Sequence, residues 1–215
     1  MATGEGPRAI GWTLMAIMVL ALAWCVWKVE YPIHQYLSNL PTAAFLVILP
    51  FLWRRRRLSD ASLVQLTLFT LLHVVGTRWL YSCVPYEDWT RSLFGVGLNE
   101  WLGWERNHFD RLVHLAFGLL VTLPAAQFLS RGFGVGRGSA LAVAVLAVFA
   151  VSAFYEIAEW LVTVVADPEN AERYNGQQGD FFDAQKDMAL AAIGSLAVAL
   201  PAGFFGGRRR ARAAG

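Results

Sequence analysis

The sequence has 215 residues, of which 56% are hydrophobic and only 16% are charged. Soluble domains carry about 25% charged residues, so this composition argues against an ordinary soluble protein. Several apolar runs approach the ~20 residues that a helix needs to cross a bilayer. We therefore predict an all-α integral membrane protein, with one polytopic domain over residues 1–215.

The first half of the chain contains three predicted spans. The first covers residues 10–27. The second, residues 37–53, is shorter and contains Pro50, so a kink is expected there. The third covers residues 63–83. Residues 84–108 are polar and rich in tryptophan and tyrosine, which favour the membrane–water boundary, and we expect a loop or a short helix on the membrane surface.

Three further spans follow, at residues 109–129, 139–166 and 181–205, which gives a bundle of about six transmembrane helices. With six spans, the basic loops and both chain ends fall on the same side of the membrane. The positive-inside rule then predicts that both termini are cytoplasmic. Because topology accounts for these short basic runs, they give no support to nucleic-acid binding. The residues concerned are Arg8, residues 54–57, Arg131, Arg137, Arg208, Arg209, Arg210 and Arg212.

A stripe of carboxylates begins the last span. Asp183 and Asp187 are four residues apart and share a helix face, and Asp180 precedes them by three. Asp180 suits a helix cap, and Asp183 suits the first turn, where the helix dipole favours acids. Asp187 lies about two turns into the span. A carboxylate at membrane depth is unfavourable by roughly 2.5–3.5 kcal/mol, so Asp187 needs a partner or a function.

Three other spans bring ionisable residues to the same level. Asp110 and His114 are four residues apart at the start of the fourth span, and Glu156 and Glu159 are three apart in the outer half of the fifth. His73 lies in the outer half of the third span. The predicted topology places all of these toward the outer leaflet, so we expect them to form one cluster with the aspartates of the last span.

Carboxylates combined with one or two imidazoles are typical ligands of a divalent cation such as Zn²⁺, Mn²⁺, Fe²⁺ or Mg²⁺. Helical bundles build metal sites from such pairs on facing helices, and a bound metal can activate water or polarise a phosphoryl or carbonyl oxygen. The predicted ligands are Asp110, His114, Glu156, Glu159, Asp183 and Asp187, with His73 as a weaker candidate. The predicted catalytic acid–base groups are Asp110, His114, Glu156, Asp183 and Asp187.

Basic residues near this level predict a place for an anionic substrate group. The planar guanidinium of Arg111 or Arg78 could hold a phosphate or a carboxylate, and Lys186 could add a point charge. The outer level of the bundle would admit the head group of a membrane lipid. The leading hypothesis is therefore a membrane-embedded hydrolase or transferase, with its site near the extracytoplasmic face, acting on a lipid-linked or cell-envelope substrate.

Two other classes of function stay open. The same carboxylates could form the site of a proton- or cation-coupled transporter, although transporter sites usually lie near the membrane midplane. They could also form a structural ion-pair network without catalysis, in which Glu156 would pair with Arg111 or Arg78. Cys25 and Cys83 either form a disulfide in an oxidising compartment or serve as small core residues. The oligomeric state cannot be read from the sequence.

Four segments resemble a known family: residues 73–76, 107–114, 155–160 and 179–188. They are similar to the YjdF-type bacterial inner-membrane proteins, which implies a multi-pass protein of the inner membrane rather than a particular chemistry. A looser similarity links the chain to VanZ-like membrane proteins, which share an Asp-x-x-x-His span start, a later Glu-x-x-Glu/Gln and a closing Asp-x-x-x-Asp/Asn. This similarity implies a role at the outer leaflet or the cell envelope. Glu159 departs from the glutamine of many VanZ-like chains.

Overall fold

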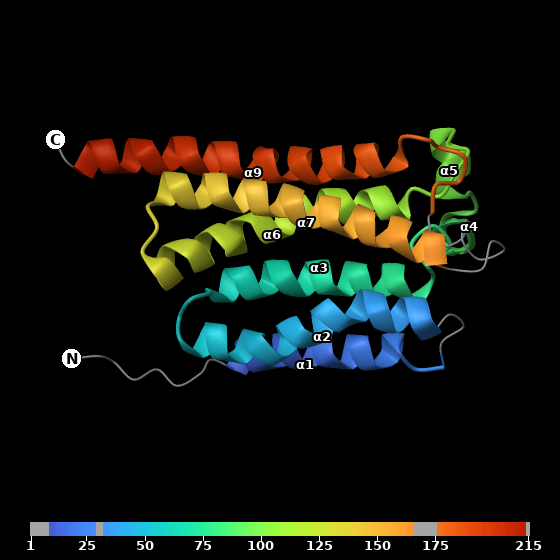
Figure 1. The fold of residues 1–215 in the computed structure, drawn as a ribbon, viewed down its shortest axis with the longest axis horizontal. Coiled ribbons are helices and arrows are strands. Elements are labelled where there is room, and N and C mark those ends of the chain that lie inside the picture. The colour runs from blue at the N-terminus through green and yellow to red at the C-terminus, as the bar shows by residue number, and fades with distance from the viewer. Residues whose placement is uncertain (1–8, 29–31, 166–175, 214–215) are drawn as a thin grey trace.

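A chain that crosses a bilayer must satisfy its backbone hydrogen bonds internally, and the apolar segments of this sequence do so as helices. The computed structural model describes residues 9–28, 32–165 and 176–213. Long helices run along one another, and short helices lie at one end of the bundle (Figure 1). The long helices are α1 (Ala9–Cys25), α2 (Pro32–Arg54), α3 (Asp60–Arg78), α6 (Phe109–Phe133), α7 (Arg137–Val165) and α9 (Asp183–Ala213). The short helices are α4 (Tyr86–Phe94) and α5 (Leu98–Leu102).

Helices α2, α3, α6, α7 and α9 are long and apolar enough to cross a membrane. Helix α1 is apolar but has 17 residues, and its length of about 25 Å falls short of the ~30 Å hydrocarbon core. The all-α bundle of about six helices is thus confirmed, and the described residues contain no strand. Ala166, the predicted end of the fifth span, lies outside the described residues.

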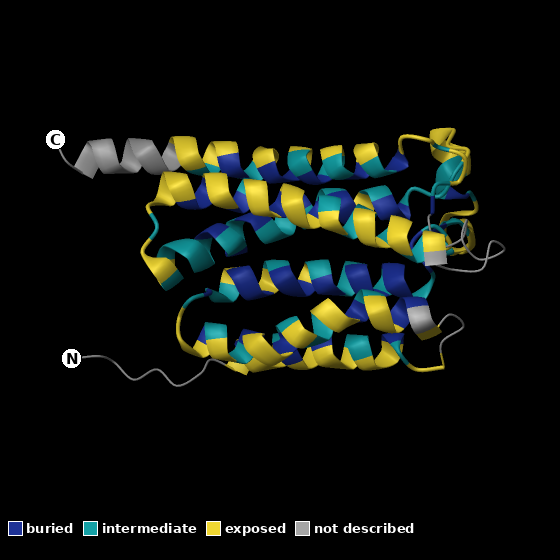
Figure 2. Cartoon of the chain, viewed as in Figure 1, coloured by how far each residue is buried: buried dark blue, intermediate teal, exposed yellow. Residues whose placement is uncertain are grey.

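Helix α6 is the centre of the bundle, since it packs against α3, α7 and α9, while α1 and α2 pack on α3. The outward faces of α1, α2, α7 and α9 carry many exposed residues (Figure 2). These include large apolar side chains such as Val47, which is 81% exposed, and Phe154, which is 73% exposed. Apolar surface of this extent is unfavourable in water and is expected to face lipid.

The third predicted span, residues 63–83, is too long at its end. Helix α3 stops at Arg78 because the chain then turns back on itself, with Tyr81 at a positive φ of 47°. The turn is allowed by Gly76, where an added Cβ would lie 2.3 Å from Tyr81 Cδ1. The phenol of Tyr81 is thereby buried inside the bundle instead of continuing the helix.

Helix α2 begins at Pro32, earlier than the predicted start at residue 37. Proline is well suited to a first helical position because it has no amide hydrogen to satisfy. The polar residues of the first turns are buried against neighbouring helices: Gln35 Nε2 donates to the carbonyl of Cys25 at 2.5 Å, and Asn39 Nδ2 donates to Thr77 Oγ1 at 3.1 Å. Buried hydrogen bonds therefore extend a helix whose polar start looked like a loop.

The two ends of the bundle differ in character. Helices α4 and α5, formed by the aromatic segment, cap one end, and exposed side chains such as Phe94 and Trp101 project from them. At the other end, the loop after α2 contacts the end of α6, where Arg57 Nη1 donates to the carbonyl of Gly132 at 2.9 Å. Two of the arginine-bearing loops therefore share one end, and their cytoplasmic location stays a prediction.

Helices α6 and α9 approach each other closely through small residues. An added Cβ on Gly118 would lie 2.2 Å from the carbonyl oxygen of Ala191, and one on Gly194 would lie 2.4 Å from that of Leu115. Small residues allow such backbone contact between membrane helices. The crossing lies one turn below His114 on α6 and fixes how α9 presents its first turns to α6.

Candidate functional site

Ionisable residues gather in two layers near the α4–α5 end of the bundle. The layer nearer the end, called here the surface network, consists of Arg106, Arg111, Asp180, Asp183 and Lys186. The layer below it, called here the buried cluster, consists of Asp110, His114, Glu156 and Asp187.

In the surface network, Asp183 lies between two guanidinium groups. Arg106 reaches both of its carboxylate oxygens, at 2.7 and 2.9 Å, and Arg111 Nη2 reaches Oδ1 at 3.0 Å. The side chain of Asp183 is only 4% exposed. The two guanidinium charges therefore offset the cost of burying its negative charge away from water. Asp183 was a predicted metal ligand and acid–base group, but its oxygens are already taken by arginine.

Asp180 completes the surface network at the edge of the bundle. Its Oδ2 accepts from Lys186 Nζ and from Arg111 Nη2, both at 2.5 Å. The hydrogen bond from Lys186 holds the pKa of this carboxyl well below its usual range. Partial burial, followed by the charge of Arg111, lowers the pKa of the neighbouring His108 imidazole. Lys186 and Arg111, predicted to bind an anionic substrate group, thus already have carboxylate partners.

A loop before α9 covers the buried cluster from this end. Arg106 Nη1 donates to the carbonyl of Gln177 at 3.0 Å, while Gln178 exchanges two hydrogen bonds with the backbone of Asn107, at 2.9 and 3.0 Å. Gly176 has a φ of +62°, and an added Cβ there would lie 4.0 Å from Asp110 Oδ2. The loop is therefore fastened directly over Asp110.

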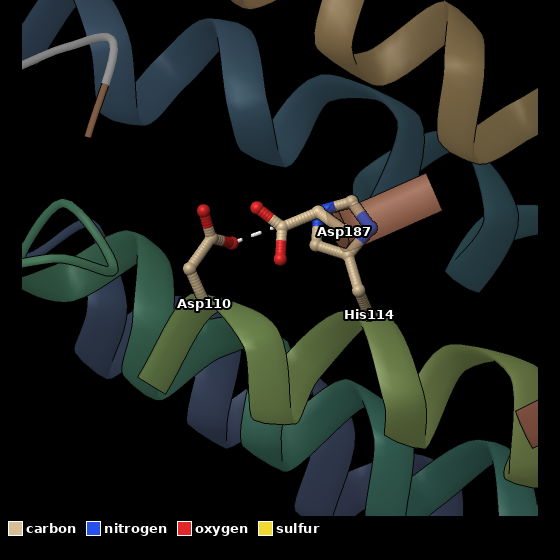
Figure 3. Close-up of side chains that lie close together, drawn as sticks. All are labelled: Asp110, His114 and Asp187. Atoms are coloured by element: carbon tan, nitrogen blue, oxygen red, sulfur yellow. Dashed lines mark ion pairs between the residues drawn. The ribbon is translucent and has the colours of Figure 1, made fainter. Parts of the chain in front are cut away.

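Three side chains of the buried cluster, from two helices, lie close enough together to share a ligand. Asp110 and His114 project from α6 toward Asp187 on α9 (Figure 3). One ligand atom from each lies within 4.8 Å of the other two, and the three side chains belong to residues that are 5%, 6% and 1% exposed. His114 Nε2 is 3.7 Å from Asp110 Oδ1. The prediction that these three residues come together is confirmed.

Helix α7 adds two groups beside the imidazole. Glu156 Oε1 lies 3.0 Å from His114 Nε2, and Ser152 Oγ lies 3.0 Å from Nδ1. A proton on Nε2 would donate to Glu156; when Nδ1–H alone is present and donates to the serine hydroxyl, Nε2 carries a free lone pair, which is the tautomer that second-shell partners impose on metal-binding histidines. Glu156 pairs with this imidazole and not with Arg111 or Arg78.

Two oxygens of the buried cluster have no hydrogen-bond partner. These are Oδ1 of Asp110 and Oδ1 of Asp187, whereas Oε1 of Glu156 faces His114 Nε2 at 3.0 Å. Leaving a buried polar atom unsatisfied costs about 1–3 kcal/mol, and more when the group is charged. Two such atoms in one place leave the cluster with unused acceptor capacity.

The remaining predicted site residues lie outside this group. His73 Nδ1 and the Tyr81 hydroxyl form a hydrogen bond of 2.7 Å. The Nε2 atom of His73 has no hydrogen-bond partner. Glu159 lies one turn beyond Glu156 and lines the neighbouring cavity. Arg78 is not at the site: it donates to the carbonyls of Cys25 at 3.0 Å and Trp27 at 2.5 Å, so it fastens α3 to the end of α1.

A cavity of about 710 Å³ reaches the buried cluster from the side, between α2, α3, α6 and α7. Asp110, His114 and Ser152 form part of its wall near the α4–α5 end, and its other walls are largely apolar. Cys25 is buried and Cys83 is exposed, and both are free thiols, so no disulfide crosslinks this end of the bundle.

Sequence reasoning missed Arg106 and Ser152. Arg106 sits in a segment without helical periodicity and meets residues more than seventy positions away, which no local pattern indicates. Ser152 could have been found, because it lies four residues before Glu156 and therefore on the same face of a helix.

A family model described as "Predicted membrane protein (DUF2238)" matches residues 10–208. The chain belongs to this family. It is also 34% identical over 144 residues to "Inner membrane protein YjdF" of Escherichia coli strain K12. The match covers 66% of this chain and 65% of that protein, so it spans just under two thirds of the relative's length. No solved structure matches. The resemblance to YjdF-type proteins is confirmed, and the chain is a multi-pass membrane protein.

Proposed function

We propose that this protein is a metal-dependent hydrolase or transferase embedded in the bacterial inner membrane. A divalent cation would be bound by Asp110, His114 and Asp187, and the substrate would be lipid-linked or part of the cell envelope. The observation that carries the proposal is the buried cluster itself. It offers three ligand atoms within 4.8 Å of one another, and carboxylate oxygens of both aspartates lack any hydrogen-bond partner.

The balance of charge supports a bound cation. In the surface network, three basic side chains face two carboxylates, so that layer needs no further positive charge. In the buried cluster, the carboxylates of Asp110, Glu156 and Asp187 face only one imidazole. Charges in a low-dielectric interior are strongly unfavourable without compensation. A divalent cation would supply the missing charge.

The types of ligand atom also narrow the choice of metal ion. Two carboxylates and one imidazole favour Zn²⁺, Mn²⁺ or Fe²⁺ over cations that take oxygen ligands alone. Such a metal supplies a Lewis acid and a water of lowered pKa. Glu156 lies beside the imidazole and is not one of the three grouped ligands. In this proposal it would accept a proton from a water or a substrate hydroxyl.

The packing of the bundle favours an enzyme over a transporter. A transport site needs a path to each face of the membrane, and such sites usually lie near the midplane. Here the buried cluster lies near one end. Below it, the described residues pack closely through the α6–α9 crossing and the apolar contacts of Leu141, Ala144 and Ala199. The predicted topology puts the cluster at the extracytoplasmic end, where cell-envelope lipids and their derivatives are available.

Metal content tests the proposal. The purified protein, refilled with Mn²⁺, Zn²⁺ or Fe²⁺ and then desalted, should retain about one metal ion per chain in elemental analysis. His114→Ala and Asp187→Asn should lose it, whereas Asp180→Asn, the same change on a carboxylate of the surface network, should keep it. A wild-type protein that retains no metal would remove the metal from the proposal, and loss in all variants alike would point to misfolding. Circular dichroism and size-exclusion profiles separate those cases.

A further inference from the structure

The bundle is open between α2 and α7. Helix α2 packs on α1 and α3, helix α7 packs on α6 and α9, and both helices line the cavity. The exposed side chains at its edges are apolar: Leu37 on α2 is 55% exposed, and Val151 and Phe154 on α7 are 55% and 73% exposed. The mouth of the cavity is therefore on the lipid-facing surface of the protein.

The cavity extends over about one leaflet of a bilayer. Along α6 its wall runs from Asp110 to Val121, a rise of about 16 Å at 1.5 Å per residue. This is close to half of the ~30 Å hydrocarbon thickness of a membrane. A hydrocarbon chain that enters here would keep the depth it has in the leaflet.

The wall changes from polar to apolar along this length. Near the α4–α5 end it includes Asp110, His114 and Tyr155, whose hydroxyl has no hydrogen-bond partner. Toward the middle of the bundle it includes Phe45, Leu66 and Val121. A molecule with one polar end and one long apolar chain matches this gradient, and it would lie in the same direction as a membrane lipid.

The described residues cover the aqueous end of the site, which favours the lateral route. The loop of residues 176–180 is hydrogen-bonded to Arg106 and Asn107, and the surface network lies over the buried cluster. Among the described residues that line the cavity there is no arginine or lysine. An anionic head group would therefore be held by the proposed metal and not by basic side chains of the cavity.

We propose that the cavity takes one hydrocarbon chain of a membrane lipid, which enters from the bilayer between α2 and α7 and brings its polar end to Asp110 and His114. The substrate class is thus a lipid that stays in its leaflet during the reaction. Occupation by the chain follows from the cavity alone, whereas chemistry at the polar end rests on the proposed function.

Photolabelling tests the occupant. The full-length protein is reconstituted in phosphatidylethanolamine–phosphatidylglycerol vesicles with a trace of phosphatidylethanolamine that carries a diazirine near the end of one acyl chain. Peptide mapping should find label on Leu66, Phe117 and Val121, deep in the cavity. Ala158→Phe at the mouth and Thr70→Phe in the wall should lower this label by about tenfold, which corresponds to a steric block of about 1.4 kcal/mol.

Ala44→Phe is the matched control, because Ala44 is exposed on α2 but does not line the cavity, and it should label like the wild type. Label spread evenly over the lipid-facing helices, or unchanged in Ala158→Phe and Thr70→Phe, would overturn the inference. The wild-type map alone decides the matter if these variants do not fold. Metal analysis of the same samples keeps the two proposals apart: Asp187→Asn should lose metal and keep the deep label, while Ala158→Phe should do the reverse.

Discussion

Asp187→Asn separates a metal site from a structural ion-pair network. The side chain of Asp187 is 1% exposed, its Oδ1 has no partner, and a ligand atom of Asp110 lies within 4.8 Å. Two unit charges within 4.8 Å of each other repel by about 3.5 kcal/mol or more at an effective dielectric constant of ~20. Removing one of them should therefore stabilise the metal-free protein, with an amide of the same shape in place of the carboxylate.

The assay is thermal unfolding in detergent, with and without a chelator. In chelator, Asp187→Asn should melt no lower than the wild type. Added metal at about one hundred times its dissociation constant should stabilise the wild type by about 2.7 kcal/mol, roughly 5–11 °C for a chain of this size, and should leave the variant unchanged. Asp180→Asn should respond to metal as the wild type does.

The opposite result is that Asp187→Asn melts well below the wild type in chelator and that metal changes the melting temperature of neither protein. That result would mean that the carboxylate already has a stabilising partner inside the protein, and the bundle would then be held by a structural network.

Three other predictions follow from the packing around the site. Gly118→Ala should destabilise the α6–α9 crossing by about 1–3 kcal/mol and lower metal retention. Gly132→Ala on the same helix is the control, because an added Cβ there meets only ordinary contacts, and it should melt no lower than the wild type. Arg106→Gln should destabilise the fold, by at most about 3–5 kcal/mol, because the buried Asp183 would keep Arg111 as its one charge partner. Asp183→Asn in the same chain should restore much of the loss in urea or thermal unfolding. A membrane-impermeant maleimide should label Cys83 in intact spheroplasts but not Cys25, which is buried; label on Cys83 only after lysis would refute the predicted topology.

Much of the fold was predictable because a bilayer imposes simple rules. The length of the apolar runs locates the spans. The predicted topology puts Asp110, His114 and Asp187 at the same depth in the membrane, and this was sufficient to predict that they meet. The end of α3 was not predictable, since the run through Cys83 is apolar enough to continue a helix. It stops because Tyr81 packs on Gly76, a tertiary contact without a local signal.

The division of the site into two layers was also hidden from the sequence. Asp183 and Asp187 are one turn apart on α9, and spacing alone treats them alike. They differ because Asp183 meets Arg106 and Arg111, whereas Asp187 meets other acids and an imidazole. Arg106 makes this difference. It comes from the aromatic segment between α3 and α6, where no helical spacing links it to Asp183.

The two layers together explain how a site so rich in charge can exist beside lipid. The surface network neutralises Asp180 and Asp183 and fastens the loop of residues 176–180 over the cluster, so described residues cover the cluster on the side nearest water. The α6–α9 crossing closes the bundle below. What stays open is the lateral cavity, whose polar wall is formed by Asp110 and His114. A cluster closed to water and open to lipid is suited to a substrate that arrives through the membrane.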